Sequence, residues 1–370
     1  MNNQALIAVA GSGKTETIVQ RYKDQPEGTL FVTFTQNGQD ELKQRLLKEN
    51  PGAEFEVIGW FKFLADHFLK PFLCDVFPTR VYNGMRLNDP TVKFGRGEGY
   101  YFNDSGEITS DRMALLSRKI CDEDDREPIK RLERIFRTIV FDEVQDLAGN
   151  DLEILQMLLE SRIEVFMVGD IRQTVFETTV SDRKNSQYGK LNKLKWFEEM
   201  QDLGSLRLEF DLTNRRCHED IVRLSNALFP PELGFEDAVS GQDETNDGHV
   251  GIFRIEESQI PYYCRAISPR GLRYNVTTGK EWNDKLSFNN FGDCKGLTFD
   301  HVLIFPTAGM RKFLADGTIL KSHATISKFY VAVTRARHSV CFVLPKKWER
   351  GDTAPVQIIR WSNEGTSGAS

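Results

Sequence analysis

Short apolar runs alternate with amphipathic stretches along most of this chain. Runs rich in β-branched and aromatic residues predict buried strands at 5–10, 30–35, 55–60, 164–170, 207–213, 249–255, 301–307 and 339–344. The spacing of apolar residues predicts helices at about 16–22, 38–47, 151–160, 218–229 and 328–337, with another near Trp196. This alternation is typical of an α/β fold with parallel, doubly wound sheets, whose ligands lie at the carboxyl ends of the strands.

Two stretches depart from the alternation. Residues 75–134 contain prolines, a glycine-spaced stretch at 95–102 and a charge-dense end, which predicts a small insertion rather than a sheet unit. The stretch 95–102 either contacts a nucleic-acid backbone or forms a hairpin turn, and the turn is favoured. We therefore expect a first domain at 1–74 and 135–205, an inserted subdomain at 75–134, a second α/β domain at 206–350 and a flexible tail at 351–370.

The first predicted strand runs directly into a glycine-rich loop followed by a helix. The loop residues are Gly11, Ser12, Gly13, Lys14 and Thr15. Glycines allow backbone N–H groups to approach phosphates, Lys14 can reach the β and γ oxygens, and the Thr15 hydroxyl can bind Mg²⁺. A plain glycine-rich turn is the alternative, but strand, loop and helix occur in the order that a nucleotide site requires. The pattern therefore predicts nucleotide binding.

An apolar run that begins at Thr138 ends in two carboxylates, Asp142 and Glu143, followed by Gln145 and Asp146. A buried strand that ends in such a pair places a magnesium ligand beside a general base in P-loop NTPases. We expect Asp142 to bind Mg²⁺ and Glu143 to act on water.

Composition and charge narrow the class of protein and the kinds of site that it can contain. No apolar run approaches the ~18 residues of a membrane span, and polar residues follow Met1, so we expect a cytoplasmic protein. The six cysteines are scattered without a CxxC pair, which disfavours zinc and iron–sulfur sites. Net charge is −6, yet residues 265–350 carry 15 Lys/Arg against 6 Asp/Glu. That segment is either a phosphate-tracking surface or a solvated face, and charge alone favours the second.

Seven motifs occur in order: GSGKT, FVTFT, IVFDEVQD, VGDIRQTVF, LTNRR, KGLTFDHVLIF and YVAVTRAR. Together they span about residues 5–345, and the chain resembles superfamily-1 helicases of the UvrD/Rep branch. The resemblance implies two RecA-like P-loop NTPase domains with parallel sheets, with ATP and Mg²⁺ in the cleft between them. It also implies a translocase on single-stranded DNA that moves 3′ to 5′.

The resemblance also implies roles for residues at matching motif positions. Gln173 would sense the γ-phosphate, and Arg216 and Arg335 would be arginine fingers. Arg215 and Gly296 fall at nucleotide-binding positions. The candidate DNA contacts are Phe34, Thr35, Phe61, Phe63 and Phe176. For each of these phenylalanines, a place in the hydrophobic core is the alternative to stacking on a base.

The chain departs from the family pattern at several positions. The adenine-recognising Gln motif would precede residue 1, Arg215 replaces the stacking Tyr of the NYR motif, and Thr298 replaces a ribose-contacting Glu. Thr178 replaces an aromatic residue that follows the third motif. Only residues 217–294 separate Arg216 from Lys295, where full-length relatives hold a large accessory domain.

These departures favour translocation over autonomous unwinding. We expect a monomer that acts with single-stranded DNA and, by a looser analogy with phage-defence and mobile-element proteins, with a nuclease or sensor partner. The main alternative is a nucleic-acid-sensing ATPase that regulates such a partner without processive movement. A degenerate scaffold is disfavoured, because the catalytic residue types are all present.

Overall fold

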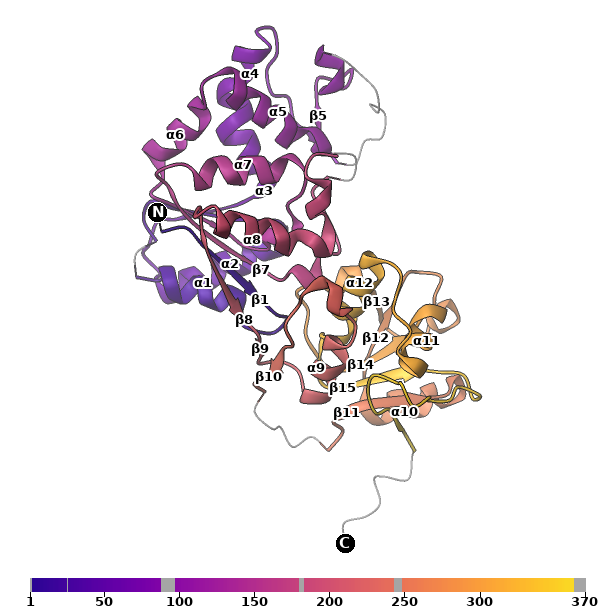
Figure 1. The fold of residues 1–370 in the computed structure, drawn as a ribbon. Coiled ribbons are helices and arrows are strands. Elements are labelled where there is room, and N and C mark those ends of the chain that lie inside the picture. The colour runs from indigo at the N-terminus through magenta and orange to yellow at the C-terminus, as the bar shows by residue number, and fades with distance from the viewer. Residues whose placement is uncertain (1, 25, 88–96, 180–182, 243–247, 363–370) are drawn as a thin grey trace. The chain divides into compact units, whose positions relative to one another are not determined.

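The structure is a computed structural model that describes residues 2–24, 26–87, 97–179, 183–242 and 248–362. Contacts divide the chain into two compact units. The first consists of Met1–Ile7 and Lys14–Phe210, and the second of Ala8–Gly13 and Asp211–Ser370. Each unit contains a six-stranded sheet flanked by helices (Figure 1). The predicted α/β class is therefore confirmed.

The sheet of the first unit has the strand order β3-β2-β6-β7-β1-β8. Its strands are β1 (Gln4–Ala8), β2 (Thr29–Thr33), β3 (Glu56–Gly59), β6 (Thr138–Phe141), β7 (Glu164–Gly169) and β8 (Arg207–Asp211). The β2–β3, β2–β6, β6–β7 and β1–β7 pairs are all parallel. Every residue of β2 and β6 is buried, which explains why both read as continuous apolar runs.

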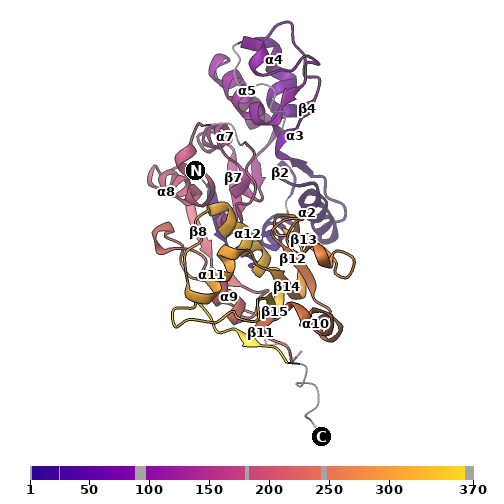
Figure 2. The same cartoon turned by 90° about the vertical axis from the view of Figure 1, so that its right-hand side faces the viewer.

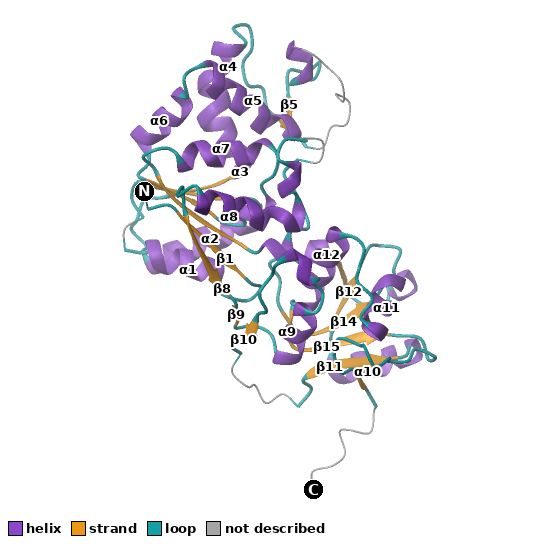
Figure 3. Cartoon of the chain, in the orientation of Figure 1, coloured by secondary structure: helices purple, strands orange, loops and turns teal. Residues whose placement is uncertain are grey.

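Helices cover this sheet, and their apolar residues complete the core. The helices next to sheet strands in sequence are α1 (Lys14–Tyr22), α2 (Gln36–Glu49), α7 (Asn150–Leu159) and α8 (Leu194–Asp202). Residues of α1 and α2 pack on the sheet in one cluster of Ile18, Val19, Tyr22, Leu42, Leu46, Phe31, Val140, Phe166 and Val168. Strands and helices alternate in this region of the chain, as the periodicity predicts (Figure 3).

The predicted insertion is mainly helical and contributes no strand to the six-stranded sheet. Helices α3 (Trp60–Leu64) and α4 (Lys70–Val76), joined by the π-helical turn Ala65–Leu69, lead into it. It continues with α5 (Ser110–Glu123), α6 (Glu127–Ile135) and a separate strand pair, β4 (Met85–Arg86) and β5 (Ile108–Thr109). Helices α4 and α5 lie together beyond α7 and α3 (Figure 2). Residues 88–96, which include the start of the glycine-spaced stretch, lie outside the described residues.

The sheet of the second unit has the order β13-β12-β14-β15-β11-β16. Its strands are β11 (Gly251–Ile255), β12 (Arg270–Arg273), β13 (Phe288–Asn290), β14 (Phe299–Phe305), β15 (Ala336–Val343) and β16 (Ile359–Arg360), and all its pairs are parallel. Its helices are α9 (Glu219–Asn226), α10 (Ile260–Ile267), α11 (Ala308–Asp316) and α12 (His323–Val333). A small separate sheet pairs β9 (Thr213–Asn214) with β10 (Val239–Ser240).

Two boundaries differ from expectation. Strand β8 was expected to begin the second domain, but it hydrogen-bonds at the edge of the first unit's sheet beside β1. The tail was expected to be loosely ordered from Gly351, but Ile359 and Arg360 form β16 and pair with Phe253 and Arg254. Residues 363–370 lie outside the described residues. Within the described part of the chain, no helix has the length and apolarity needed to span a membrane.

One buried histidine makes stability depend on pH. His67 is 7% exposed, its ring contacts Phe63 and Phe136, and its Nδ1 lies 3.2 Å from Arg131 Nη1. Burial, followed by the charge of Arg131, lowers the pKa of His67 to about 4. The folded chain therefore binds fewer protons than the unfolded chain between about pH 4 and 6.5, so stability falls as the pH falls through this window.

We predict that His67→Gln flattens this dependence. Between pH 7 and pH 5 the wild type should lose about 2 kcal/mol more of its free energy of unfolding than the variant does, because only the wild type must charge the imidazole on unfolding. Urea unfolding at both pH values measures the difference. Parallel losses in the two proteins would show that His67 does not titrate in this way.

Candidate active site

The glycine-rich loop follows β1 and ends where α1 begins at Lys14. Gly11 and Gly13 have positive φ angles of 71° and 94°, which favour glycine. A Cβ at Gly11 would lie 2.6 Å from the Arg216 Cβ and 2.7 Å from Asn214 Oδ1, so no other residue fits there. The buried Ser12 Oγ has no hydrogen-bond partner among the described residues, as expected of a loop whose polar groups face a phosphate.

Residues 8–13 group with the second unit because backbone bonds join them to the segment after β8. Val9 N donates to Asp211 O at 3.0 Å, and Arg215 N donates to Gly11 O at 3.0 Å. Ala10 N donates to the Tyr330 hydroxyl at 3.0 Å. The Arg215 guanidinium donates to Ser12 O and, at 2.9 Å, to Asp211 Oδ2. The nucleotide-binding role of Arg215 stays a prediction.

The two carboxylates follow β6, as the sequence predicts. Asp142 N donates to Val32 O of β2 at 2.9 Å, and the Asp142 carboxylate accepts from Glu143 N at 2.8 Å. Glu143 has φ 57° and ψ 37°, a left-handed conformation that is costly for a residue with a Cβ. The neighbouring structure must therefore hold Glu143 in place.

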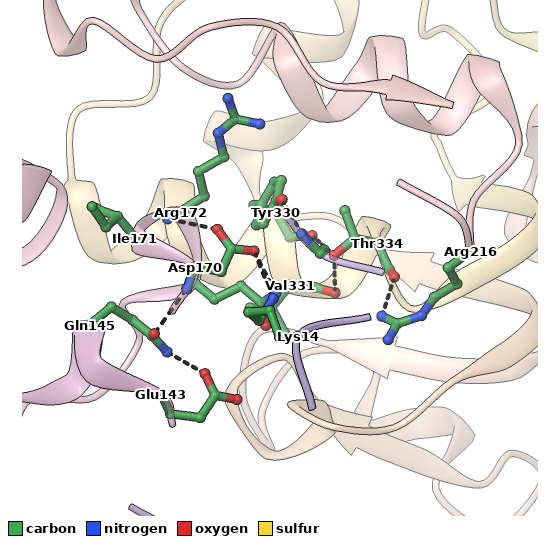
Figure 4. A network of polar contacts seen from close by, with 12 residues as sticks. Lys14, Glu143, Gln145, Asp170, Ile171, Arg172, Arg216, Tyr330, Val331 and Thr334 are labelled. Atoms are coloured by element: carbon green, nitrogen blue, oxygen red, sulfur yellow. Dashed lines mark hydrogen bonds and ion pairs between the residues drawn. The ribbon is translucent and has the colours of Figure 1, made fainter. Parts of the chain in front are cut away.

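Gln145 supplies part of that restraint. Its side-chain amide donates to Glu143 Oε2 at 2.5 Å, and its carbonyl oxygen accepts from Asp170 N at 3.0 Å (Figure 4). A Cβ at Gly169 would lie 2.6 Å from this carbonyl oxygen, so glycine is required where β7 ends. Gln145 therefore ties the carboxylate at the end of β6 to the backbone at the end of β7. The sequence motif alone assigns no role to Gln145.

Asp170 joins this chain of contacts to the phosphate-loop lysine. Its Oδ2 lies 4.0 Å from Lys14 Nζ and accepts from Gln173 Nε2 at 2.7 Å, while its Oδ1 accepts from Arg172 N at 3.1 Å. Asp170 is 1% exposed, so its charge acts in a poorly solvated place. The structure thus connects Lys14, Asp170, Gln145 and Glu143 within the first unit, and it places Gln173 against Asp170.

The two predicted arginine fingers lie near each other in the second unit. Arg216 Nη1 donates to Thr334 O at 3.1 Å (Figure 4). Arg335 donates to Val331 O and Leu297 O, each at 3.1 Å. Burial, followed by the charge of Arg335, lowers the pKa of Arg216 to about 10. Two partly or fully buried like charges form a site that favours an anion.

Comparisons with known proteins find similar sequences. Residues 1–179 match the family model described as AAA domain (AAA_19). The chain is similar to the probable DNA helicase II homolog of Mycoplasma pneumoniae, at 20% identity over 71% of this chain and 44% of that protein. The resemblance to superfamily-1 helicases of the UvrD/Rep branch is thus confirmed.

Solved structures of helicases are also similar. The PRRSV helicase has 14% identity and a TM-score of 0.45, over 93% of this chain and 53% of that chain. Arterivirus nonstructural protein 10 (helicase) in complex with DNA has 12% identity and a TM-score of 0.47, over 93% and 61%. The chain spans about half the length of the relatives that it matches.

No group of three or more His, Cys, Asp or Glu side chains able to hold a metal occurs among the described residues. A P-loop NTPase needs no such group, since its Mg²⁺ takes most of its ligands from phosphates and water. The residues present fit this mode, because Thr15 lies in the first turn of α1 and Asp142 follows β6.

The candidate DNA-contacting residues differ in solvent exposure. Phe176 is 46% exposed, and the half-buried rings of Phe34 and Phe61 lie 6.0 Å apart. Thr35 is exposed but caps α2 by accepting from Gly38 N at 3.1 Å. The prediction that Phe63 contacts DNA is wrong. Its side chain is 0% exposed and packs against Trp60, Phe68 and Phe141, so its ring is not available for stacking on a base.

Gly296 lies in an exposed loop before β14 with φ 85°, and a Cβ there would meet open space. Nothing in the described structure therefore requires glycine for packing at this position. The positive φ accounts for the residue type, and a role in nucleotide binding stays a prediction.

We predict that Gln145→Met lowers the turnover number for ATP by roughly ten- to a hundredfold while nucleotide affinity stays within about twofold. The variant keeps the size of the side chain but removes both the N–H that donates to Glu143 and the carbonyl oxygen that accepts from Asp170 N, so Glu143 loses its tie to the end of β7. Steady-state hydrolysis and nucleotide titration check this. The matched control is Gln20→Met, at an exposed glutamine of α1; equal activity in the two variants would contradict the role of Gln145.

Proposed function

We propose that this chain hydrolyses ATP and uses the energy to move along single-stranded DNA, with 3′ to 5′ polarity as the family resemblance implies. The observation that carries the proposal is the connected set Lys14, Asp170, Gln145 and Glu143 at the ends of β6 and β7. A cation for phosphate and a restrained carboxylate for water are the two elements that phosphoryl transfer requires.

The roles follow from chemistry and position. Lys14 and the N–H groups of residues 11–15 would bind the phosphates, and Thr15 and Asp142 would hold Mg²⁺, which neutralises charge on the phosphate oxygens. Glu143 would orient water, held there by Gln145. Gln173 would report the γ-phosphate through Asp170, to which it donates a hydrogen bond.

Positive charge for the transition state would come from Arg216 and Arg335. Support for Arg216 comes from its place beside the phosphate loop, since its Cβ would touch any side chain at Gly11. The lowered pKa of this group leaves it fully charged at neutral pH. Phosphates are among the anions that a pair of arginines binds well.

One observation favours translocation without autonomous unwinding. The described residues of the interval 217–294 include helices α9 and α10 and strands β10, β11, β12 and β13, all of which lie in the second unit. The described part of this interval therefore belongs to the second unit and contains no large accessory domain. A partner protein, such as a nuclease or sensor, would then supply the function that the accessory domain provides in larger relatives.

The first test is ATP hydrolysis with and without a single-stranded DNA oligonucleotide, beside unwinding of a forked duplex. We expect strong stimulation by DNA, weak or no unwinding, and turnover reduced by several orders of magnitude in Glu143→Gln with nucleotide binding retained. Affinity for DNA should fall steeply with salt if the basic residues of 265–350 contact phosphates. Hydrolysis indifferent to DNA would instead support a switch regulated by protein.

Phe176→Ala tests the stacking role of the exposed phenylalanine. Affinity for single-stranded DNA should fall roughly ten- to a hundredfold, because one stacked base is worth about 1–3 kcal/mol. The matched control is Phe210→Ala, since Phe210 is 44% exposed against 46% for Phe176. Fluorescence anisotropy with labelled oligonucleotides compares the two variants, and equal affinities would remove Phe176 from the DNA site.

A further inference from the structure

The loop that follows Glu143 and Gln145 is held at three consecutive residues. Asp146 O accepts from Thr178 N at 2.9 Å. Leu147 O accepts from Lys193 Nζ. Ala148 N donates to both Thr178 Oγ1, at 3.0 Å, and Asp151 Oδ2, at 3.1 Å.

The groups that hold the loop come from several elements of the first unit. Asp151 lies in the first turn of α7, and its carboxylate accepts from Thr178 Oγ1 and, at 2.8 Å, from Trp60 Nε1 at the start of α3. Lys193 precedes α8, and its Nζ lies 4.0 Å from Glu177 Oε1. We call Asp151, Thr178 and Lys193 the loop clamp.

The members of the loop clamp are buried, although all three are polar. Lys193 is 0% exposed, Asp151 2% and Thr178 6%. Burial raises the pKa of Asp151 to about 6 and lowers the pKa of Lys193, so burying both groups is costly. A stability role alone is a weak explanation, because apolar residues of similar volume often serve a core as well or better.

We propose that Thr178 and Lys193 are positioning residues that hold the loop 146–148 so that Gln145 and Glu143 keep the geometry needed for hydrolysis. The inference rests on the proposed ATP hydrolysis and extends it. Three fixed points on adjacent residues leave the loop little freedom, and Glu143 needs such support because of its left-handed backbone. Thr178 thus has a defined use here, where the sequence suggested only a missing aromatic.

The clamp also joins the acidic loop to the segment that carries Phe176. Thr178 follows Phe176 by two residues and contributes both its N–H and its hydroxyl to the loop 146–148. A displacement of Phe176 would therefore act on the loop through short, directional bonds.

The test compares Thr178→Val, which removes the hydroxyl at nearly constant size, with Thr178→Ser, which keeps it. We expect Thr178→Val to lower the turnover number for ATP by on the order of ten- to a hundredfold with little change in nucleotide affinity, and Thr178→Ser to retain most activity. Wild-type turnover in Thr178→Val would overturn the inference, as would equal losses in both variants.

Lys193→Met separates positioning from stability. Replacing a buried ammonium by an apolar side chain of similar length can leave the melting temperature unchanged or raise it. A stable variant with reduced turnover supports positioning, and a stable variant with full turnover contradicts it for Lys193.

A readout without activity keeps the inference distinct from the proposed function. Hydrogen exchange at the Ala148 amide should be faster in Thr178→Val than in Thr178→Ser, since two acceptors hold this N–H in the wild type. Equal exchange rates at Ala148 in the two variants would overturn the inference that Thr178 holds the loop 146–148. A wild type whose hydrolysis ignores DNA would instead overturn the translocase proposal and leave the comparison of the variants intact.

Discussion

The site depends on one side chain that spans two strand ends. Gln145 donates to the carboxylate after β6 and accepts from the backbone after β7, so the position of each strand end fixes the other. This arrangement requires that β6 and β7 be neighbours in the sheet and that Gly169 lack a side chain. The left-handed backbone of Glu143 persists because the surrounding bonds restrain it.

We call the two contacts of Gln145, with Glu143 and with Asp170 N, the Gln145 bridge. A second set of bonds fixes the loop 146–148 that follows Gln145. The bridge orients the carboxylate, whereas the contacts of Thr178, Lys193 and Asp151 fix the main chain that follows it. The two sets use different chemistry. A neutral amide contacts the Glu143 carboxylate, whereas Lys193 and Asp151 bond to the main chain at residues 147 and 148.

The sequence predicts those parts of the site that depend on local spacing. The glycine loop and the carboxylates after β6 each lie within a few adjacent residues, and each strand or helix of the α/β alternation has its own local period, so pattern alone finds them. The bridge of Gln145 could not be predicted in this way, because it depends on which strands are neighbours. The same limit explains β8, whose apolar pattern specifies a strand but not the sheet that it joins.

Phe63 shows a second limit of prediction from sequence. An aromatic residue beside a DNA-binding motif gives the same sequence pattern whether its ring faces solvent or the core. The helical turn after β3 sends Phe61 to a half-buried position and Phe63 to a fully buried one. The sequence shows Thr178 only as a residue that replaces an aromatic, because its partners Asp151 and Ala148 are some thirty residues earlier in the chain. A role assigned from motif position therefore has to be checked against the burial and contacts of the side chain.

The grouping of residues 8–13 with the second unit has a consequence for dissecting the molecule. The chain passes from one unit to the other at residues 7–8, 13–14 and 210–211, so no single cut separates it into two self-contained pieces. A fragment that ended at Phe210 would keep the phosphate loop but lose the Asp211, Arg215 and Tyr330 groups that bond to its backbone. The glycine-rich loop thus depends on groups from both sides of a cut at Phe210. Fragment complementation, rather than isolated domains, is therefore the suitable way to study each half.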